Sequence, residues 1–291
     1  MRLVLSFGLV WAIAYVKHSA RGLHTTNKII SREDKIDFFC CGQRPLATDN
    51  GASEVAQTTD DIQGAIPHSH PSICSIRPVN NTYHMFSGVL VKNLAGKYYI
   101  ITNWFSGTHP FRNLFYEAHC GVYDRTDLSE PQRVSVRFSD LKISDAETNL
   151  AILIPATALP TNRYITAACL PNEDWYEGEK AISAGWYNKS PTYNIQAYSK
   201  LHQFQAYITS RATCEQKYRD IYSLKLMCTS LPETEFFTCN PDFGSPLYTY
   251  RENRWTLTGI AKFIGDCYKP DRLGMYTDIF QAKDWINSII N

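Results

Sequence analysis

The sequence predicts an all-β protein whose chain ends in a single helix. From about residue 83 onward, short apolar or alternating runs are separated by turn residues, and this spacing is typical of antiparallel barrels and sandwiches. Hydrophobic residues make up 44% of the 291 residues, which is enough for a globular core. A chain of this length can hold one large domain or two small ones.

The expected strands are rich in aromatic and β-branched residues and are bounded by residues that favour turns. They are Phe86–Val91, Tyr98–Thr102, Val134–Phe138, Leu150–Ile154, Ala181–Ala184, Leu201–Ile208, Leu224–Cys228, Leu247–Tyr250, Trp255–Phe263 and Gly274–Tyr276. Only the last stretch has helical spacing. There, Ile279, Trp285, Ile286, Ile289 and Ile290 would line one face of a helix that docks on the body.

The start of the chain has the composition of a secretory signal peptide. A basic tip at Arg2 precedes an apolar run that ends near Val16, which is too short to span a bilayer. We expect residues 1–20 to be removed after Ala20, with an uncleaved anchor as the alternative. Residues 21–73 are polar and contain turn formers, so we expect an N-terminal extension with little regular structure, followed by a domain over 74–291. The predicted location is extracellular.

Charge and composition argue against several classes of partner. The chain has 29 basic and 28 acidic side chains, a net charge of +1, and no basic stripe, so we expect no nucleic-acid partner. No later stretch is long and apolar enough for a membrane span. The cysteines lack paired Cys-x-x-Cys spacing, so we expect no metal site and no cofactor.

Nine cysteines in a secreted chain predict a disulfide framework with one cysteine left over. Two sequons, at Asn80 and Asn188, are candidate glycosylation sites. The second is weakened by Pro191, which directly follows it.

One stretch resembles the nucleophile loop of the trypsin/chymotrypsin family of serine proteases: Cys239-Asn240-Pro241-Asp242-Phe243-Gly244-Ser245-Pro246-Leu247. Other family-like markers follow in the family's order. They include Ser87–Val91, Tyr99–Ser106, Thr148–Leu153, Ala168–Pro171, Ala184–Trp186, Thr258–Ile260 and Gly274–Thr277. The resemblance covers about residues 75–291. It implies two six-stranded antiparallel β-barrels with a C-terminal helix, and it says nothing of activity, because fold does not imply function.

The resemblance also shows what the catalytic machinery lacks. The position of the general-base histidine falls on Phe105, that of the orienting aspartate on Asn149, and that of the nucleophilic serine on Phe243. Pro241 replaces a glycine that donates a backbone N–H to the oxyanion, and proline has no N–H. Because all three members of the triad are missing, we expect a pseudoprotease that is not an enzyme.

The family's specificity pocket is altered in the same way. Its base corresponds to Phe237, and its wall corresponds to Lys262, Phe263 and Ile264. Phe237, Phe243 and Ile264 would form an apolar plug, which is either a repacked core or a groove for a partner. The activation site near Asp60–Gly64 lacks a preceding Lys or Arg. Asp242, which in active members pairs with the new N-terminus, is retained, and we expect local N–H groups to satisfy it.

The family resemblance implies the pairs Cys41–Cys169, Cys214–Cys228 and Cys239–Cys267. Cys74 and Cys120 remain, and they would lie on neighbouring strands of the first barrel, so we expect them to pair. Cys40 is then the odd cysteine, either free or linked to another chain as in a disulfide-linked dimer.

The expected function is therefore that of a secreted, non-catalytic protease homologue. Similar homologues act as cofactors, decoys or regulators in extracellular protease cascades, in innate immunity or in reproductive secretions, so the expected partner is a protein such as a protease or its zymogen. Two alternatives stay open. One is a structural component of a secretion linked through Cys40, and the other is a hydrolase with a rebuilt site that uses Ser245 and His109. His84, His119 and His202 are interpreted as surface or barrel residues.

Overall fold

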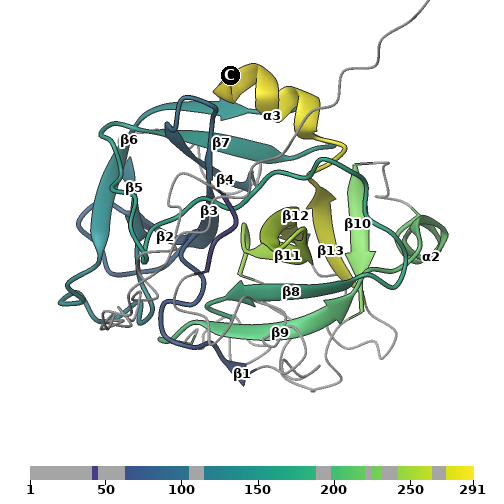
Figure 1. Ribbon diagram of the computed structural model, residues 1–291, viewed down its shortest axis with the longest axis horizontal. Coiled ribbons are helices and arrows are strands. Elements are labelled where there is room, and N and C mark those ends of the chain that lie inside the picture. Colours follow the sequence, from purple (N-terminus) through teal and green to yellow (C-terminus); the bar gives the residue numbers. More distant parts are fainter. Residues whose placement is uncertain are drawn as a thin grey trace, which may run out of the picture. The chain divides into compact units, whose positions relative to one another are not determined.

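The computed structural model describes residues 41–44, 63–104, 115–187, 198–219, 225–230, 242–263 and 273–291, all within one compact unit, Ile36–Asn291. Strands dominate this part of the chain (Figure 1). They form a closed barrel and a second, larger sheet, so the all-β prediction is confirmed.

The first barrel contains six antiparallel strands in the order β2-β3-β4-β7-β6-β5. Their bounds are β2 Ile73–Pro78, β3 Phe86–Lys92, β4 Tyr98–Asn103, β5 Tyr116–Cys120, β6 Val134–Ile143 and β7 Leu150–Pro155. Alternate residues of these strands fill the barrel, among them Ile76, Leu90, Ile100, Val136 and Leu153. The β-branched residues fit such a pleated, buried surface well.

The second sheet contains seven strands in the order β1-β9-β8-β11-β12-β13-β10. Their bounds are β1 Gln63–Gly64, β8 Lys180–Gly185, β9 His202–Tyr207, β10 Leu226–Thr229, β11 Pro246–Arg251, β12 Arg254–Phe263 and β13 Gly274–Asp278. An isolated bridge joins Ile208, the residue after β9, to Thr229 of β10. The six strands from β9 to β10 therefore form a nearly closed barrel. The short strand β1 is a seventh that the six-stranded expectation did not include.

A shared apolar cluster lies where the two sheets meet. It includes Val89 and Ile101 of the first barrel together with Ile182, Trp186 and Leu257 of the second sheet. All five side chains are buried. Burial of this apolar area stabilises the association of the two sheets at roughly 25 cal/mol per Å². The turn Asp242–Ser245, which precedes β11, also lies at this interface between the two sheets.

Helix α3, Lys283–Ile290, confirms the predicted C-terminal helix. Ile286 and Ile290 are its buried residues, as the helical spacing required. The side-chain amide of Asn93, in the turn after β3, donates to the carbonyl of Ile290 at 2.9 Å. The chain therefore ends docked on the first barrel.

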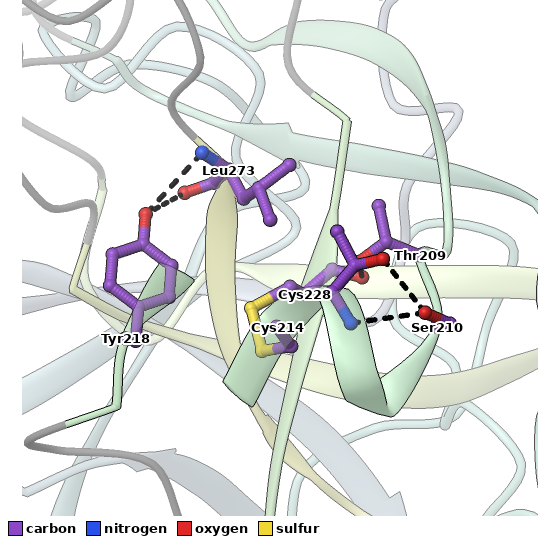
Figure 2. The surroundings of a disulfide bond; sticks show 7 residues. Thr209, Ser210, Cys214, Tyr218, Cys228 and Leu273 are labelled. Carbon is purple, nitrogen blue, oxygen red and sulfur yellow. Dashed lines mark hydrogen bonds between the residues drawn. A yellow bond between two sulfur atoms is a disulfide. The ribbon is translucent and has the colours of Figure 1, made fainter. Parts of the chain in front are cut away.

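A second helix, α2 at Arg211–Lys217, was not predicted. Ser210 caps it by accepting a hydrogen bond from the Thr213 N–H, and Cys214 ties it to Cys228 of β10 (Figure 2). The hydroxyl of Tyr218, the residue after the helix, donates to the carbonyl of Leu273 at 2.7 Å. A helix this short is marginal on its own, so the cap and the disulfide hold it in place.

The folded body begins earlier than residue 74. Strand β1 pairs with β9 through Gln63 and Gln203, and Ser69, His70 and Ser72 are buried. The end of the expected extension, residues 63–73, is therefore part of the folded body: Gln63–Gly64 join the second sheet, and Ile73 begins β2 of the first barrel. Half of its buried residues are polar (Ser69, His70 and Ser72), and they interrupt the apolar pattern that would have revealed the segment.

Three disulfide bonds join pairs that the sequence analysis named: Cys41–Cys169, Cys74–Cys120 and Cys214–Cys228. Cys74 and Cys120 lie directly opposite each other on β2 and β5. Cys40, Cys239 and Cys267 lie outside the described residues, as does the sequon at Asn188. Asn80 is exposed in the turn after β2. Within the ranges that the structure describes, no helix has the length and apolarity to cross a membrane.

Candidate functional site

The candidate site is the turn Asp242–Ser245, which holds the Phe243 that the sequence analysis placed at the nucleophile position. The turn closes through a hydrogen bond from the Ser245 N–H to the Asp242 carbonyl at 3.0 Å. The Ser87 N–H, on β3 of the first barrel, donates to the Phe243 carbonyl at 2.8 Å. The turn therefore bridges the two sheets.

Gly244 allows this close approach. Its φ of 77° lies in the left-handed region, which suits a residue without a Cβ. A Cβ at this position would overlap the carbonyl oxygen of Ser87 and the hydroxyl of Thr102. The Thr102 hydroxyl in turn donates to the Ser87 carbonyl at 2.7 Å. Glycine is thus required both by the backbone conformation and by the neighbouring strands.

Asp242 is buried beneath the turn, and its carboxylate receives three hydrogen bonds. The Ser87 hydroxyl and the Trp186 N–H donate to Oδ2 at 2.6 Å and 2.7 Å, and Nε2 of His84 lies 3.0 Å from Oδ1. The expectation of local N–H donors is met by only one of these, the amide of Trp186. The other two donors come from the first barrel.

The structure places His84, which the sequence analysis interpreted as a surface or barrel residue, against the first barrel. It is buried, its ring lies 5.2 Å from that of Trp186, and its Nδ1 lies 2.8 Å from the Ser75 hydroxyl. No motif marks His84 in the sequence, because it is a single histidine in a polar loop. Its role depends on a contact with Asp242, 158 positions away in the chain.

Asn149 lies next to Asn103 and Trp104, the two residues before Phe105 in the sequence. The carbonyl of Asn149 accepts hydrogen bonds from the Trp104 N–H at 2.8 Å and from the Asn103 side-chain amide at 3.1 Å. Phe105 itself lies outside the described residues. The described neighbours of Asn149 are therefore the last two residues before position 105.

Ser245, the candidate for a displaced nucleophile, lies inside the second sheet. The relative exposure of Ser245 is 1%. Its side chain packs closely on Gly185, because a Cβ built at Gly185 would lie 3.2 Å from the Cβ of Ser245. The buried Tyr187 hydroxyl nearby pairs with the Ser183 hydroxyl at 2.9 Å, and burial raises the pKa of Tyr187 well above its usual value. In this conformation the Ser245 hydroxyl is out of reach of a substrate. His109 lies outside the described residues.

Of the residues assigned to the former specificity pocket, Lys262 is placed in full. Its ammonium group donates to the Glu147 carbonyl at 3.0 Å, which links β12 to the loop before β7, and burial lowers the pKa of Lys262. Phe263 ends β12 opposite Met275. Phe237, Pro241 and Ile264 lie outside the described residues, so the apolar plug stays a prediction.

An ion pair lies beside Lys262. Nζ of Lys225 lies 2.6 Å from Oδ2 of Asp145, and the Thr148 N–H donates to the other oxygen at 2.7 Å. Lys225 first, and then the backbone of Thr148, lower the pKa of Asp145 to about 2. This edge of the site therefore carries a cation and an anion that neutralise each other. Where side chains are described, no three His, Cys, Asp or Glu gather in a way that could hold a metal ion.

Comparisons with known proteins agree with this fold. A family model described as "Trypsin" matches residues 65–286. The chain is 28% identical over 152 residues to mannan-binding lectin serine protease 1 of Mus musculus, covering 50% of this chain and 21% of that protein. It is 29% identical over 134 residues to urokinase-type plasminogen activator of Gallus gallus, covering 45% of this chain and 31% of that protein.

The match thus spans less than a third of the length of these curated relatives. Among solved structures, neuropsin, a serine protease expressed in the limbic system of mouse brain, superposes with a TM-score of 0.64. It covers 79% of this chain and 99% of that chain at 20% identity, so it supports the fold alone.

Proposed function

The chain belongs to the trypsin family, and we propose that within this family it is a secreted homologue without peptidase activity that acts by binding another protein. The observation that carries the proposal is Phe243, which stands in the turn that would present a nucleophile. A benzyl side chain has no oxygen with which to attack a carbonyl. The nearest hydroxyl along the chain, that of Ser245, is buried in the second sheet.

The residues at the other catalytic positions also support a lack of peptidase activity. Asn149 cannot replace an aspartate as the orienting acid without a loss of about 10⁴ in rate, and Phe105 cannot take up a proton. Pro241 removes a backbone donor from the oxyanion site, where most residual catalysis would arise. The nucleophile, the base and one of the two oxyanion donors are therefore absent, and the remaining backbone N–H has no reacting group to assist.

The surroundings of Asp242 favour a preformed binding surface. Three donors from two sheets hold the carboxylate, so the turn with Phe243 at its tip has a fixed conformation. A rigid turn loses little entropy when a partner binds to it. We propose that the partner is an extracellular protease or its zymogen, and that the protein regulates a protease cascade in immunity or in a reproductive secretion.

Secretion is supported by the disulfides. Three bonds in one chain are characteristic of proteins that fold in an oxidising compartment. The other three cysteines, Cys40, Cys239 and Cys267, belong to none of these three bonds. If Cys239 and Cys267 pair, Cys40 is available to another chain, and this favours as a second candidate a structural component of a secretion.

The absence of activity is tested by labelling the secreted protein with a fluorophosphonate probe for activated serines. A trypsin-family protease that carries the full triad serves as the positive control. We expect no labelling of this protein and no hydrolysis of peptide esters above the buffer rate. Labelling at Ser245, abolished by Ser245→Ala, would overturn the proposal in favour of a rebuilt hydrolase.

The binding role is tested by affinity purification of the tagged protein from its native fluid, with and without reductant. Recovery of a protease or zymogen in both conditions supports the regulatory role. Recovery of structural proteins or multimers that reductant releases supports the second candidate. A Cys40→Ser variant distinguishes the two, because it should abolish reductant-sensitive assembly and leave reductant-insensitive binding unchanged.

A further inference from the structure

Three large apolar side chains are exposed around the loop between β2 and β3. The relative exposures are 63% for Tyr83 and 37% for Met85 in the loop, and 58% for Phe115, which directly precedes β5. Phe115 lies beside the loop, because its carbonyl accepts a hydrogen bond from the Val79 N–H at 2.8 Å. We call Tyr83, Met85 and Phe115 the apolar patch. Neighbouring apolar side chains on the surface of a protein mark a place where another group binds.

Asn80 lies at the corner of a tight turn in the same loop. The Asn81 N–H closes the turn by donating to the Pro78 carbonyl at 3.1 Å, which makes Asn80 the third of its four residues. The φ of Asn80 is 59°, in the left-handed region that a type II turn requires at its third position and that asparagine tolerates. The residue is exposed, so the turn presents the Asn80 side chain to solvent.

Both aromatic residues of the patch are held close to Asn80 along the backbone. The Tyr83 N–H donates to Oδ1 of Asn81 at 2.8 Å, and Asn81 is the residue after Asn80. Phe115 bonds Val79, the residue before it. A group attached to the Asn80 side chain therefore starts beside the apolar patch.

The sequence at this turn, Asn80-Asn81-Thr82, is an acceptor motif for N-linked glycans. We propose that Asn80 carries an N-linked glycan whose innermost sugars lie over the apolar patch and cover it. This inference rests on the secretion proposed above, because N-linked glycans are added in the secretory pathway. It does not depend on whether the protein is catalytic.

The attachment is a transfer of a sugar chain without oxidation or reduction. The donor is an oligosaccharide joined to a membrane lipid through a pyrophosphate. A C–N bond forms between the anomeric carbon of the first sugar and Nδ2 of Asn80, and the C–O bond from that carbon to the pyrophosphate breaks. The amide gives up one proton, and the lipid pyrophosphate leaves with the bonding electrons.

A glycan suits this patch for two reasons. The C–H faces of a sugar ring are apolar enough to pack on aromatic side chains, while its hydroxyl groups stay in water and make the surface polar. Because the glycan is tethered at Asn80, its contact with the patch is intramolecular, and even a weak contact is populated. A separate protein partner on the patch is the alternative that the test must distinguish.

The patch borders the candidate site. His84 stands between Tyr83 and Met85 in the chain, and its Nε2 lies 3.0 Å from Oδ1 of Asp242. A glycan on this loop would therefore limit the approach of a protein partner to the Asp242–Ser245 turn from the side that the loop forms.

The test compares two variants of the full chain secreted from cultured eukaryotic cells. Thr82→Ala destroys the acceptor motif, and Thr82→Ser keeps it, while both leave Asn80 in place and change only an exposed residue. An N-glycosidase converts a glycosylated asparagine to aspartate, which peptide mass spectrometry locates. We expect this conversion at position 80 in the wild-type protein and in Thr82→Ser, and its absence in Thr82→Ala.

Oxidation of Met85 by dilute peroxide measures whether the glycan covers the patch. Met227 and Met275 are buried at 1% exposure, so Met85 is the methionine of the described chain that peroxide reaches most easily. Since oxidation follows exposure, the rate at Met85 should be at least about threefold lower in Thr82→Ser than in Thr82→Ala. Hydroxyl-radical labelling of Tyr83 should fall in parallel, and that of Tyr176, exposed at 66% before β8, should be equal in the two variants.

A secreted protein with Asn80 unmodified would overturn this inference and leave the proposed secretion intact. A chain that stays in the cell without a glycan would overturn both. A modified Asn80 with equal Met85 oxidation in the two variants would show that the glycan points away and that the patch is open to a protein partner, which would also contradict the proposal.

Discussion

Nε2 of His84 lies 3.0 Å from the buried carboxylate of Asp242, and this contact joins the loop before β3 to the turn before β11. Together with the Ser87 and Trp186 donors, it satisfies a charge that would otherwise be costly to bury. The conformation of the Phe243 turn is thus set by the first barrel as much as by the turn's own sequence.

Replacing His84 by Ala should lower the free energy of unfolding by about 2 kcal/mol, because a buried carboxylate loses one of its three donors. Urea denaturation followed by tryptophan fluorescence measures the change. His202→Ala is the control, since the half-buried His202 ring bonds the Lys200 carbonyl and stacks on Tyr198. A loss no larger in His84→Ala than in His202→Ala would contradict the prediction.

Gly244→Ala should be one of the most destabilising single substitutions in the described chain, at about 3 kcal/mol or more. The new Cβ would overlap backbone and side-chain atoms of Ser87 and Thr102, in addition to the strain of a positive φ. Gly96→Ala isolates the strain, because Gly96 has a φ of 80° and open space around it. That control should lose only about 1 kcal/mol, as measured by thermal or urea unfolding.

Restoring only the nucleophile should not restore catalysis. A Phe243→Ser variant still has Phe105 at the base position and Asn149 at the orienting position, so its hydroxyl would have no group to take its proton. We expect fluorophosphonate labelling and ester hydrolysis of this variant to stay at background. Rapid labelling at position 243 would show that another base reaches the turn.

The Asp145–Lys225 pair should contribute stability that depends on acid. The pKa of Asp145 is lowered to about 2, below the value of about 3.9 expected in the unfolded chain. Its contribution is therefore present above about pH 4 and is lost as the pH falls through about 2. Because the pair is largely exposed, the effect should stay below about 1 kcal/mol.

Urea unfolding of Asp145→Asn at about pH 5 and about pH 2 measures this contribution. The stability gap to the wild-type protein should be present at the higher pH and should close at the lower one. Lys225→Met should behave in the same way. If the stability difference between variant and wild-type protein instead grows in acid, the Asp145–Lys225 pair does not cause it.

Removal of the Cys74–Cys120 bond should destabilise the protein more than removal of the Cys214–Cys228 bond. The two bonds close sequence separations of 46 and 14, and the loop-entropy relation gives a difference of about 1 kcal/mol. All four cysteines are buried, so double alanine variants of each pair leave comparable packing defects. Guanidinium denaturation of both variants provides the comparison, and an equal loss would count against the entropic account.

Most of the strands could be predicted from the sequence, because the hydrophobic periodicity of β3, β4, β7 and β12 is uninterrupted. The periodic pattern did not mark β2 and β5, which the sequence analysis expected only as the two strands that carry Cys74 and Cys120. Their outward-facing residues include Arg77 and His119, which are buried against loops and neighbouring strands rather than exposed. Buried polar residues break the apolar pattern that reveals a strand, and only the tertiary structure supplies their partners.

The candidate site was predictable as far as its motif extends. The turn around Phe243 and the retained Asp242 could be read from the sequence, since the family resemblance aligns them directly. The partners of Asp242 could not, because Ser87 lies on the first barrel, His84 lies in the loop before β3, and both are ordinary residue types in their local sequence. Contacts between segments far apart in the chain carry no local signature.

The Cys41–Cys169 bond and strand β1 bracket residues 45–62 from both sides. A proteolytic cut within that interval would divide the polypeptide into two chains that remain one covalent molecule. The segment upstream of the cut would stay attached to the body through Cys169, while the downstream end would stay paired with β9. A cut in this interval would therefore change the mass of the protein only by the water added on hydrolysis, until a reductant separates the pieces.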